Sequence, residues 1–188
     1  MTDSRERIVD FLFETGMLAR VPRSGFSYLG SGEQSVAEHS LRMTQMAFVL
    51  ARLDGNVDAE RLLAMCLFHD LPETRTSDHN NVTKRYNAPD EPSAIADQTD
   101  GLPFGDHVAG LIEEFEAGET REAQLARDAD QLEMILELKR LADIGNPNAA
   151  KWMPFVIERL RSETARQLAE TIRDRNSDAW WWTDQIVR

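Results

Sequence analysis

Apolar residues recur three and four positions apart along most of this chain, and this spacing constrains the fold more than any other feature. Between Ser35 and Leu53 the apolar positions follow the period of one face of an α-helix. Ser35 precedes the first of them and Glu38 follows three residues later, a pair typical of a capped helix N-terminus. No two-residue alternation is long enough to indicate a sheet. The sequence therefore predicts an all-α fold.

Helix signals of this kind cover most of the chain and predict a bundle of about six or seven helices. The main interruption runs from Leu71 to Gly105 and holds four prolines among many polar residues. Irregular segments of this length inside a compact domain are usually functional or disordered, so we interpret this one as a long active-site loop. The helices are expected at about residues 5–18, 35–53, 58–68, 106–116, 120–142 and 149–173.

A length of 188 residues is that of one domain. We predict a single domain over residues 1–188, with its core at about 8–170 and a tryptophan-rich tail at 176–188. The one cysteine, Cys66, rules out an internal disulfide and a cysteine-rich zinc site. It lies in the apolar run 62–68, which favours a small buried thiol over a nucleophile. Such cysteine usage fits the cytoplasm best.

The charge balance narrows the choice of partners. With 21 Lys and Arg against 33 Asp and Glu, the net charge of −12 repels polyanions such as DNA, RNA and anionic lipid. No apolar run approaches the roughly 20 residues of a membrane span, and the first residues lack the pattern of a signal peptide. We therefore expect neither a nucleic acid polymer nor a membrane as partner. A small anionic substrate would need a local source of positive charge, and a bound divalent cation is one candidate.

Two of the four histidines occupy positions that suggest metal binding. His39 falls on the first turn of the apolar helix predicted from Ser35, and His69 together with Asp70 ends the next helix. An adjacent His-Asp pair is unusual for a core position, because a buried carboxylate without a partner costs several kcal/mol. A bound cation would remove that cost. Taken singly, each side chain is ordinary core or surface, and only the combination indicates a site.

A further carboxylate comes from the helix that begins near Thr120. Asp130 borders the apolar face of this helix, and Asp128 competes with it, because one helix cannot readily aim two residues, two positions apart, at one point. With Asp130, the set would offer two imidazoles and two carboxylates. Such a mixed nitrogen and oxygen set suits Mn, Co, Fe, Ni, Zn or, less naturally, Mg. The candidate ligands of one divalent cation are then His39, His69, Asp70 and Asp130.

These residues fall in four sequence blocks, which are Arg20-Val21-Pro22-Arg23, Ser35-Val36-Ala37-Glu38-His39-Ser40, Phe68-His69-Asp70-Leu71-Pro72-Glu73 and Asp128-Ala129-Asp130. The blocks, in this order, resemble the HD-domain metal-dependent phosphohydrolase superfamily and, within it, the 5'-deoxynucleotidase branch. The resemblance spans about residues 8–170 and implies a single HD domain. It also implies that the four candidate ligands bind one divalent metal, with Asp130 favoured over Asp128.

The resemblance also assigns roles beyond the metal. It implies that Glu73 and Asp78 orient the attacking water and assist proton transfer. Arg20 matches the arginine that contacts the substrate phosphate, a role that suits the forked donors of a guanidinium. The remaining cations near the predicted loop, among them Arg23 and Lys84, are interpreted as solvated charge. The other two histidines, His79 and His107, and the cation Arg85 are given no role at the site.

The activity implied by the resemblance is metal-dependent hydrolysis of nucleoside 5'-monophosphates, with deoxynucleotides favoured. One alternative is an enzyme for nucleoside triphosphates or another small phosphoester. Another is a non-catalytic, nucleotide-binding regulatory module, against which the intact ligand set argues. Near the end of the chain, the adjacent indoles of Trp180, Trp181 and Trp182 cannot share one helix face. We expect them to take part in a homodimer contact, with packing on their own chain as the alternative.

Overall fold

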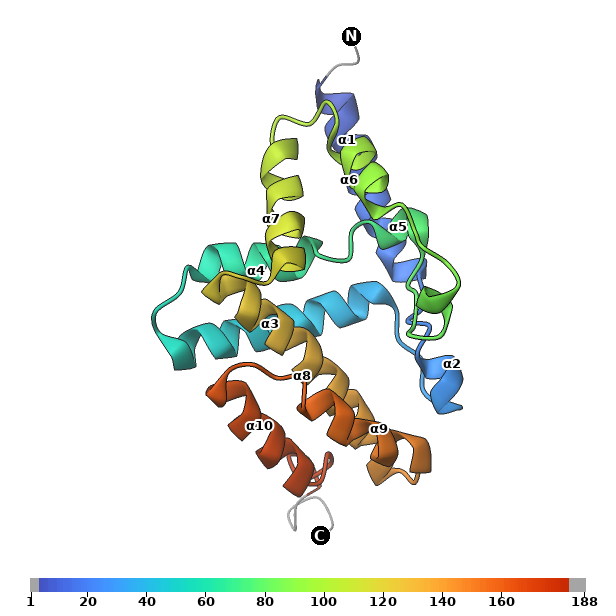
Figure 1. Cartoon of the computed structure of the whole chain (residues 1–188), viewed down its shortest axis with the longest axis vertical. Coiled ribbons are helices and arrows are strands. Elements are labelled where there is room, and N and C mark those ends of the chain that lie inside the picture. Colours follow the sequence, from blue (N-terminus) through green and yellow to red (C-terminus); the bar gives the residue numbers. More distant parts are fainter. Residues whose placement is uncertain (1–3, 183–188) are drawn as a thin grey trace.

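The computed structural model describes residues 4–182, and the regular structure of this part of the chain is helical. One isolated antiparallel bridge, between Pro22 and Ser35, is its only β-structure. The predicted all-α class is therefore confirmed (Figure 1). The elements are α1 (Ser4–Thr15), η1 (Gly16–Arg20), α2 (Phe26–Leu29), α3 (Val36–Asp54), α4 (Ala59–Phe68), α5 (Glu73–Thr76), η2 (Thr83–Arg85), α6 (Glu91–Thr99), α7 (Gly105–Ala117), α8 (Arg121–Asp143), α9 (Pro147–Ile157) and α10 (Glu163–Asp174), where η marks a 3-10 helix.

The main core forms where α3, α4 and α8 pack together, with α9 against α8 and α10 against both α8 and α3 (Figure 1). The expected capping of α3 is present: the Ser35 hydroxyl accepts the Glu38 backbone N–H at 3.2 Å, and the Glu38 carboxylate accepts the Ser35 N–H at 2.7 Å. This capping box satisfies two otherwise unpaired donors and starts the helix that carries His39. The largest fully buried side chains of this core include Met43, Leu50, Leu62, Leu125 and Ile135.

A smaller apolar cluster lies where α1 and α6 meet α7 and the end of α4. Its buried members are Phe11, Leu71, Leu102, Val108 and Ile112. Leu71 follows directly on the His-Asp pair, so this cluster fixes the chain just beyond the predicted metal ligands. The two clusters together hold the end of α4 from both sides.

The stretch from residue 71 to 105 is not one long loop, and that part of the prediction is wrong. It contains α5, η2 and α6. The α6 helix is capped by Asp90, whose side chain accepts the Ser93 backbone N–H at 3.1 Å, and Pro92 lies in its first turn. The buried side chain of α6 that makes polar contacts is Gln98, which donates to the Leu71 carbonyl at 3.1 Å. A helix anchored by a glutamine carries little apolar periodicity, which is why the sequence did not indicate it.

The single helix predicted at about 149–173 is also wrong, because the chain turns between α9 and α10. Ser162 caps α10 by accepting the Ala165 N–H at 3.2 Å. The turn before it is fixed from α8, where the Asp128 carboxylate accepts the backbone N–H groups of Arg161 at 2.7 Å and Ser162 at 2.8 Å. Asp128 is only 1% exposed. Its carboxylate is therefore committed to the turn and is unavailable to a metal.

None of the helices in the described range combines the length and apolarity needed to cross a membrane. Beyond α10, the Ser177 backbone N–H donates to Asp143 at 2.8 Å and holds the start of the predicted tail against α8. The three indoles lie at the surface, with Trp180 79% exposed, Trp181 42% and Trp182 56%. Residues 183–188 of the predicted tail and residues 1–3 lie outside the described part of the chain.

Candidate metal centre and active site

His39 projects from the first turn of α3 into the space between α3, α4 and α8, and its side chain is fully buried. Its Nδ1 lies 2.9 Å from Oε2 of Glu133 on α8. Burial opposes ionisation of Glu133, but His39, Gln34 and Arg42 together outweigh it and hold the Glu133 pKa below the usual value. An ionised carboxylate can only accept, so Nδ1 carries the proton. His39 therefore turns Nε2 toward the site, where a bound cation would take the place of a proton on that nitrogen.

His69 follows the last residue of α4 and presents the same ring nitrogen. Its Nδ1 lies 3.1 Å from the Cys66 backbone carbonyl, which accepts the Nδ1 proton. The Nε2 atom lies 3.1 Å from Oδ2 of Asp70. The ring centroids of His39 and His69 are 5.7 Å apart. Both imidazoles are thus held by their Nδ1 atoms with Nε2 directed to one point.

The carboxylates complete the cluster. Asp70 Oδ2 lies 3.8 Å from His39 Nε2, and Asp130 Oδ1 lies 3.2 Å from the same nitrogen. One ligand atom each from His39, His69 and Asp70 falls within 4.8 Å of the other two. His39 Nε2 and Asp70 Oδ2 are buried and make no hydrogen bond of regular geometry within residues 4–182. Unsatisfied buried nitrogen and oxygen atoms that converge in this way fit a divalent cation.

The electrostatics of the cluster favour positive charge despite its burial. Burial and the Arg23 guanidinium both oppose protonation of His39, but the neighbouring carboxylates of Asp130 and Glu133 together outweigh them and raise its pKa to about 9. For Asp130 the balance is similar, because its interaction with His39 holds the carboxyl pKa below the ordinary value against the effect of burial. The cluster is a buried anionic pocket that stabilises a cation.

Arg23, in contrast to its interpretation as solvated charge, is largely buried beside the predicted metal ligands. Its side chain is 13% exposed, and Nη1 lies 3.6 Å from Asp70 Oδ2. Arg20 ends η1 with an exposed side chain and does not line the cavity described below. The backbone explains the difference: the bridge between Pro22 and Ser35 turns the chain so that Arg23 follows it into the site. The structure therefore brings Arg23, and not Arg20, to the cluster.

Asp78 reaches the site on the loop between α5 and η2. Its Oδ2 accepts the Ser24 backbone N–H at 2.5 Å and the Ser24 hydroxyl at 2.7 Å. The preceding residue, Ser77, has φ 66°, a left-handed conformation that is strained for a residue with a side chain. Asn80 adds a hydrogen bond from Nδ2 to the Ser24 hydroxyl at 3.1 Å. The loop is thereby tied to the segment that carries Arg23.

Glu73 begins α5, three residues after Asp70. Its Oε2 is buried and has no hydrogen-bond partner among the described residues. Burial raises the pKa of Glu73 to about 9, and the neighbouring carboxylates of Asp70 and Asp78 act in the same direction. Arg23 and Lys84 offset this only in part. Glu73 is therefore a carboxyl group that retains its proton near neutral pH in this environment.

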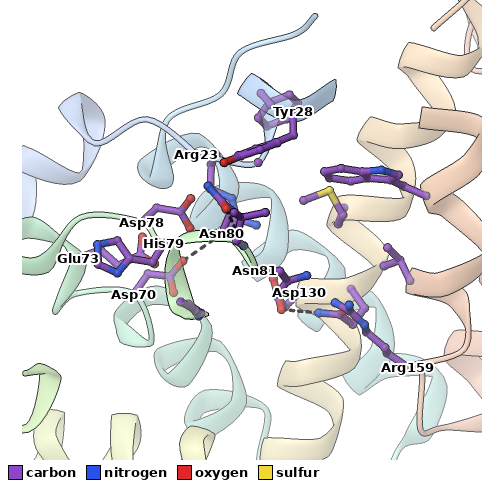
Figure 2. Close-up of a pocket in the computed structure, with 18 of the residues that line it drawn as sticks. Arg23, Tyr28, Asp70, Glu73, Asp78, His79, Asn80, Asn81, Asp130 and Arg159 are labelled. Carbon is purple, nitrogen blue, oxygen red and sulfur yellow. Dashed lines mark hydrogen bonds and ion pairs between the residues drawn. The ribbon is translucent and has the colours of Figure 1, made fainter. Parts of the chain in front are cut away.

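These groups open on a cavity of about 610 Å³, within the range of roughly 300–1,000 Å³ typical of small-molecule sites. Figure 2 shows Asp70, Glu73 and Asp78 on one side of this cavity, with Tyr28 and Arg159 farther away from them. The charged side holds Arg23 and the aspartates, and the other side is formed by residues of α2, α8 and α9. His79 lines the cavity and His107 does not. Neither belongs to the metal-ligand cluster.

Sequence reasoning missed Glu133, the residue that orients His39. Glu133 is fully buried, and its Oε1 accepts a hydrogen bond from Gln34 Nε2 at 2.7 Å and lies 3.1 Å from Arg42 Nη1. The available signal was its position three residues after Asp130, which places both on one face of α8. Ser24, which holds Asp78, offered no signal, because its partner is 54 residues away in the sequence.

The fold and the donor set together define a class: all-α proteins in which histidines and aspartates from separate helical segments form a cluster that could hold a metal ion. The family profile of the HD domain matches residues 15–173, and the chain belongs to the HD domain family. The sequence is 32% identical over 149 residues to the 5'-deoxynucleotidase HDDC2 of Danio rerio, covering 76% of this chain and 74% of that protein.

Two further comparisons agree with this assignment. The human 5'-deoxynucleotidase HDDC2 is 32% identical over 143 residues, covering 73% of this chain and 69% of that protein. A conserved hypothetical protein from Pyrococcus furiosus has a similar solved structure, with a TM-score of 0.74 and 28% identity, covering 88% of this chain and 97% of the other. The similarity therefore extends over the whole arrangement of helices that builds the site.

Proposed function

We propose that this protein is a metal-dependent phosphohydrolase that removes the phosphate from nucleoside 5'-monophosphates, deoxynucleotides in particular. The observation that carries the proposal is the convergence of one ligand atom each from His39, His69 and Asp70 within 4.8 Å, with buried atoms left unsatisfied. The relatives named 5'-deoxynucleotidase support the choice of substrate. The size of the cavity is consistent with a mononucleotide.

The cation would be held by His39, His69, Asp70 and Asp130. When bound, a divalent cation polarises a phosphoryl oxygen and lowers the pKa of a bound water. Two imidazole nitrogens with carboxylate oxygens suit Mn, Co, Fe, Ni or Zn, and Mg less naturally. The burial of the cluster and its tendency to stabilise positive charge support one cation at this place.

The remaining polar groups would each have a separate role in the transfer of the phosphate to water. Arg23, 3.6 Å from Asp70, is positioned to bind the oxygens of a phosphate held at the cluster. Asp78, fixed by Ser24, would orient the attacking water as a hydrogen-bond acceptor. Glu73, protonated in its environment, would donate its proton to the leaving 5'-oxygen of the sugar. Arg20 would contact the phosphate only if η1 moved, since its side chain lies outside the cavity.

A substrate panel tests this proposal. The purified protein is reconstituted in turn with Mn, Co, Ni, Zn and Mg and offered the deoxy and ribose forms of nucleoside mono-, di- and triphosphates. We expect phosphate release from dAMP, dGMP and TMP in preference to their ribose counterparts. Preference for triphosphates would support the alternative of an enzyme that hydrolyses nucleoside triphosphates. No release from any nucleotide with any metal would contradict the proposal and favour a regulatory module.

Two variants separate the proposed roles. Asp70→Ala removes a ligand and is expected to lose both metal and turnover. Glu73→Gln keeps the shape and should keep the metal while losing turnover, by roughly 10²–10⁴-fold for loss of a proton-transfer group. Asp97→Asn, at an exposed position of α6, is a control that should change neither metal binding nor turnover. Equal metal loss in Asp70→Ala and Glu73→Gln would contradict the proton-transfer role.

We further propose that the protein acts in the cytoplasm as a homodimer. The fully buried Cys66 has no disulfide partner, consistent with a reducing compartment. The exposed indoles of Trp180 and Trp182 would be covered by a second copy of the chain. Light scattering on the wild type and on a chain truncated before Ala179 tests the contact. An unchanged dimer after truncation would exclude these indoles from the interface.

A further inference from the structure

The cavity has an aromatic side whose function is not explained by phosphate chemistry. It is formed by Tyr28 on α2, Met134 on α8, and Trp152 and Phe155 on α9. In Figure 2, Tyr28 lies above the cavity, away from Glu73 on the catalytic side. Metal binding and proton transfer need none of these side chains. The part of the substrate that extends away from the phosphate must face them.

The aromatic surfaces are available to a ligand. Tyr28 is 48% exposed and Phe155 is 65% exposed, although both line the cavity, and Trp152 is half-buried against the main core. Within residues 4–182 no ring stacks on Tyr28, Trp152 or Phe155, whereas other aromatic pairs do occur. Planar rings that stay open beside a polar site offer a stacking surface.

A cation lies on the same side. Trp152, Phe155 and Arg159 are three or four residues apart, which brings them to one face of α9 and the turn after it. The Arg159 side chain makes no hydrogen bond or ion pair within the described part of the chain, in a protein whose net charge is −12. Its donors are free to meet acceptor atoms on the edge of a stacked ring, as guanidinium groups do with purines.

We propose that this side of the cavity is a nucleobase-binding subsite, in which Trp152 and Tyr28 form the stacking platform and Arg159 donates to the edge of the base. The inference rests on the proposed function and adds to it the part of the substrate that carries specificity. Stacking tolerates every base because each has a flat face. The platform therefore admits all four deoxynucleotides, and purines bind more tightly because their larger rings cover more of it.

The test compares dAMP with 2-deoxyribose 5-phosphate, which keeps the sugar and phosphate and lacks the base. Dissociation constants are measured by calorimetry in a Glu73→Gln background, so that neither ligand is consumed, and KM and kcat are measured separately with Glu73 intact. Trp152→Leu and Tyr28→Leu should weaken dAMP binding by roughly 5- to 100-fold, the effect of losing a base stack. Binding of 2-deoxyribose 5-phosphate should change less than about twofold.

Matched controls exclude a general loss of structure. Tyr86 is 83% exposed and Trp180 is 79% exposed, and neither lines the cavity, so Tyr86→Leu and Trp180→Leu should leave both dissociation constants unchanged. Thermal unfolding of each variant identifies any that is poorly folded. Arg159→Gln is a second variant that tests the same subsite without changing the core. It should weaken dGMP binding more than TMP binding.

The outcomes are distinct for the subsite and for the proposed function. The subsite would be overturned if Trp152→Leu weakened the binding of dAMP and 2-deoxyribose 5-phosphate equally, or if the wild-type protein bound both with equal affinity. Phosphate release would still support the phosphohydrolase in either case. Selective loss of dAMP binding without any phosphate release by the protein with intact Glu73 would support the subsite and contradict the enzyme.

Discussion

Removal of the Glu133 carboxylate is the perturbation that best tests how the metal site is built. Glu133 Oε2 accepts a hydrogen bond from His39 Nδ1 at 2.9 Å and so directs Nε2 to the site as the ligand atom. In Glu133→Gln the side chain keeps its size, but its amide can turn either an oxygen or a nitrogen toward the ring. The ring then loses the ionised acceptor that selects one tautomer, and a fraction of the molecules present a protonated Nε2, which cannot bind a cation.

The expected magnitude follows from the contacts that are lost. Groups that hydrogen-bond to a metal ligand typically change metal affinity by about 10–100-fold, which is roughly 1.4–2.8 kcal/mol. Glu133→Ala has an additional effect, because His39 Nδ1 and Gln34 Nε2 both lose their buried acceptor. At about 1–3 kcal/mol for each unsatisfied group, unfolding free energy falls by roughly 2–6 kcal/mol. For a chain of this size the midpoint temperature then falls by about 4–24 °C.

The assay is competition for Co or Mn with a chromophoric chelator, together with thermal unfolding of the metal-free protein. Glu137→Gln is the matched control, since Glu137 lies one turn farther along α8, is 6% exposed and pairs with Arg42 and Arg140 without contacting His39. We expect Glu133→Gln to weaken metal binding and Glu137→Gln to leave it unchanged. Wild-type metal affinity in Glu133→Gln would refute the reasoning that this carboxylate fixes the ligand tautomer.

Two further predictions concern residues outside the cluster. Asp128→Ala leaves two backbone donors of the turn before α10 without an acceptor, so it should lower the unfolding free energy by about 2–6 kcal/mol and leave metal affinity unchanged. Asp130→Ala should instead weaken metal binding in a titration. Equal metal loss in both would return Asp128 to the ligand set. The Glu14 pKa is lowered chiefly by its hydrogen bond with Arg75, so this contact stabilises the fold above the ordinary pKa of 4.5 and the stabilisation is lost as the pH falls through the lower folded value. Glu14→Gln should therefore lower the unfolding midpoint by about 1–4 °C at pH 7 and by progressively less below pH 4.5, and a difference that does not shrink in acid would contradict the linkage.

The strongly periodic helices could be predicted from the sequence because their apolar spacing is a local property. The α3 helix begins and ends close to its expected bounds, since the Ser35 cap and Gly55 after it act within a few residues. The α6 helix was missed because its anchor is the polar Gln98, and the break before α10 was missed because it depends on Asp128, more than 30 residues earlier. Local patterns carry no information on such distant hydrogen bonds.

The same distinction applies to the site. His39, His69 and Asp70 could be recognised because two histidines and a carboxylate at helix ends are costly unless they share a function. The prediction for Arg23 was wrong, because its sequence position, three residues after Arg20, gives no sign that it is not surface charge. Only the bridge at Pro22 directs it toward the cluster. The aromatic side of the cavity was not foreseen, since Tyr28 and Trp152 meet only when α2 and α9 lie across one space.

The sequence alone therefore determined the helical class of this protein and indicated His39, His69 and Asp70 as a cluster that could hold a metal ion. Helix periodicity and donor chemistry are set by neighbouring residues, so they can be read from the order of the side chains. The tertiary structure decided the ring nitrogen that each histidine presents, the aspartate of α8 that faces the cluster, and the arginine that reaches it. Each of these depends on a hydrogen bond or an ion pair between distant segments, and such contacts exist only once the helices have packed.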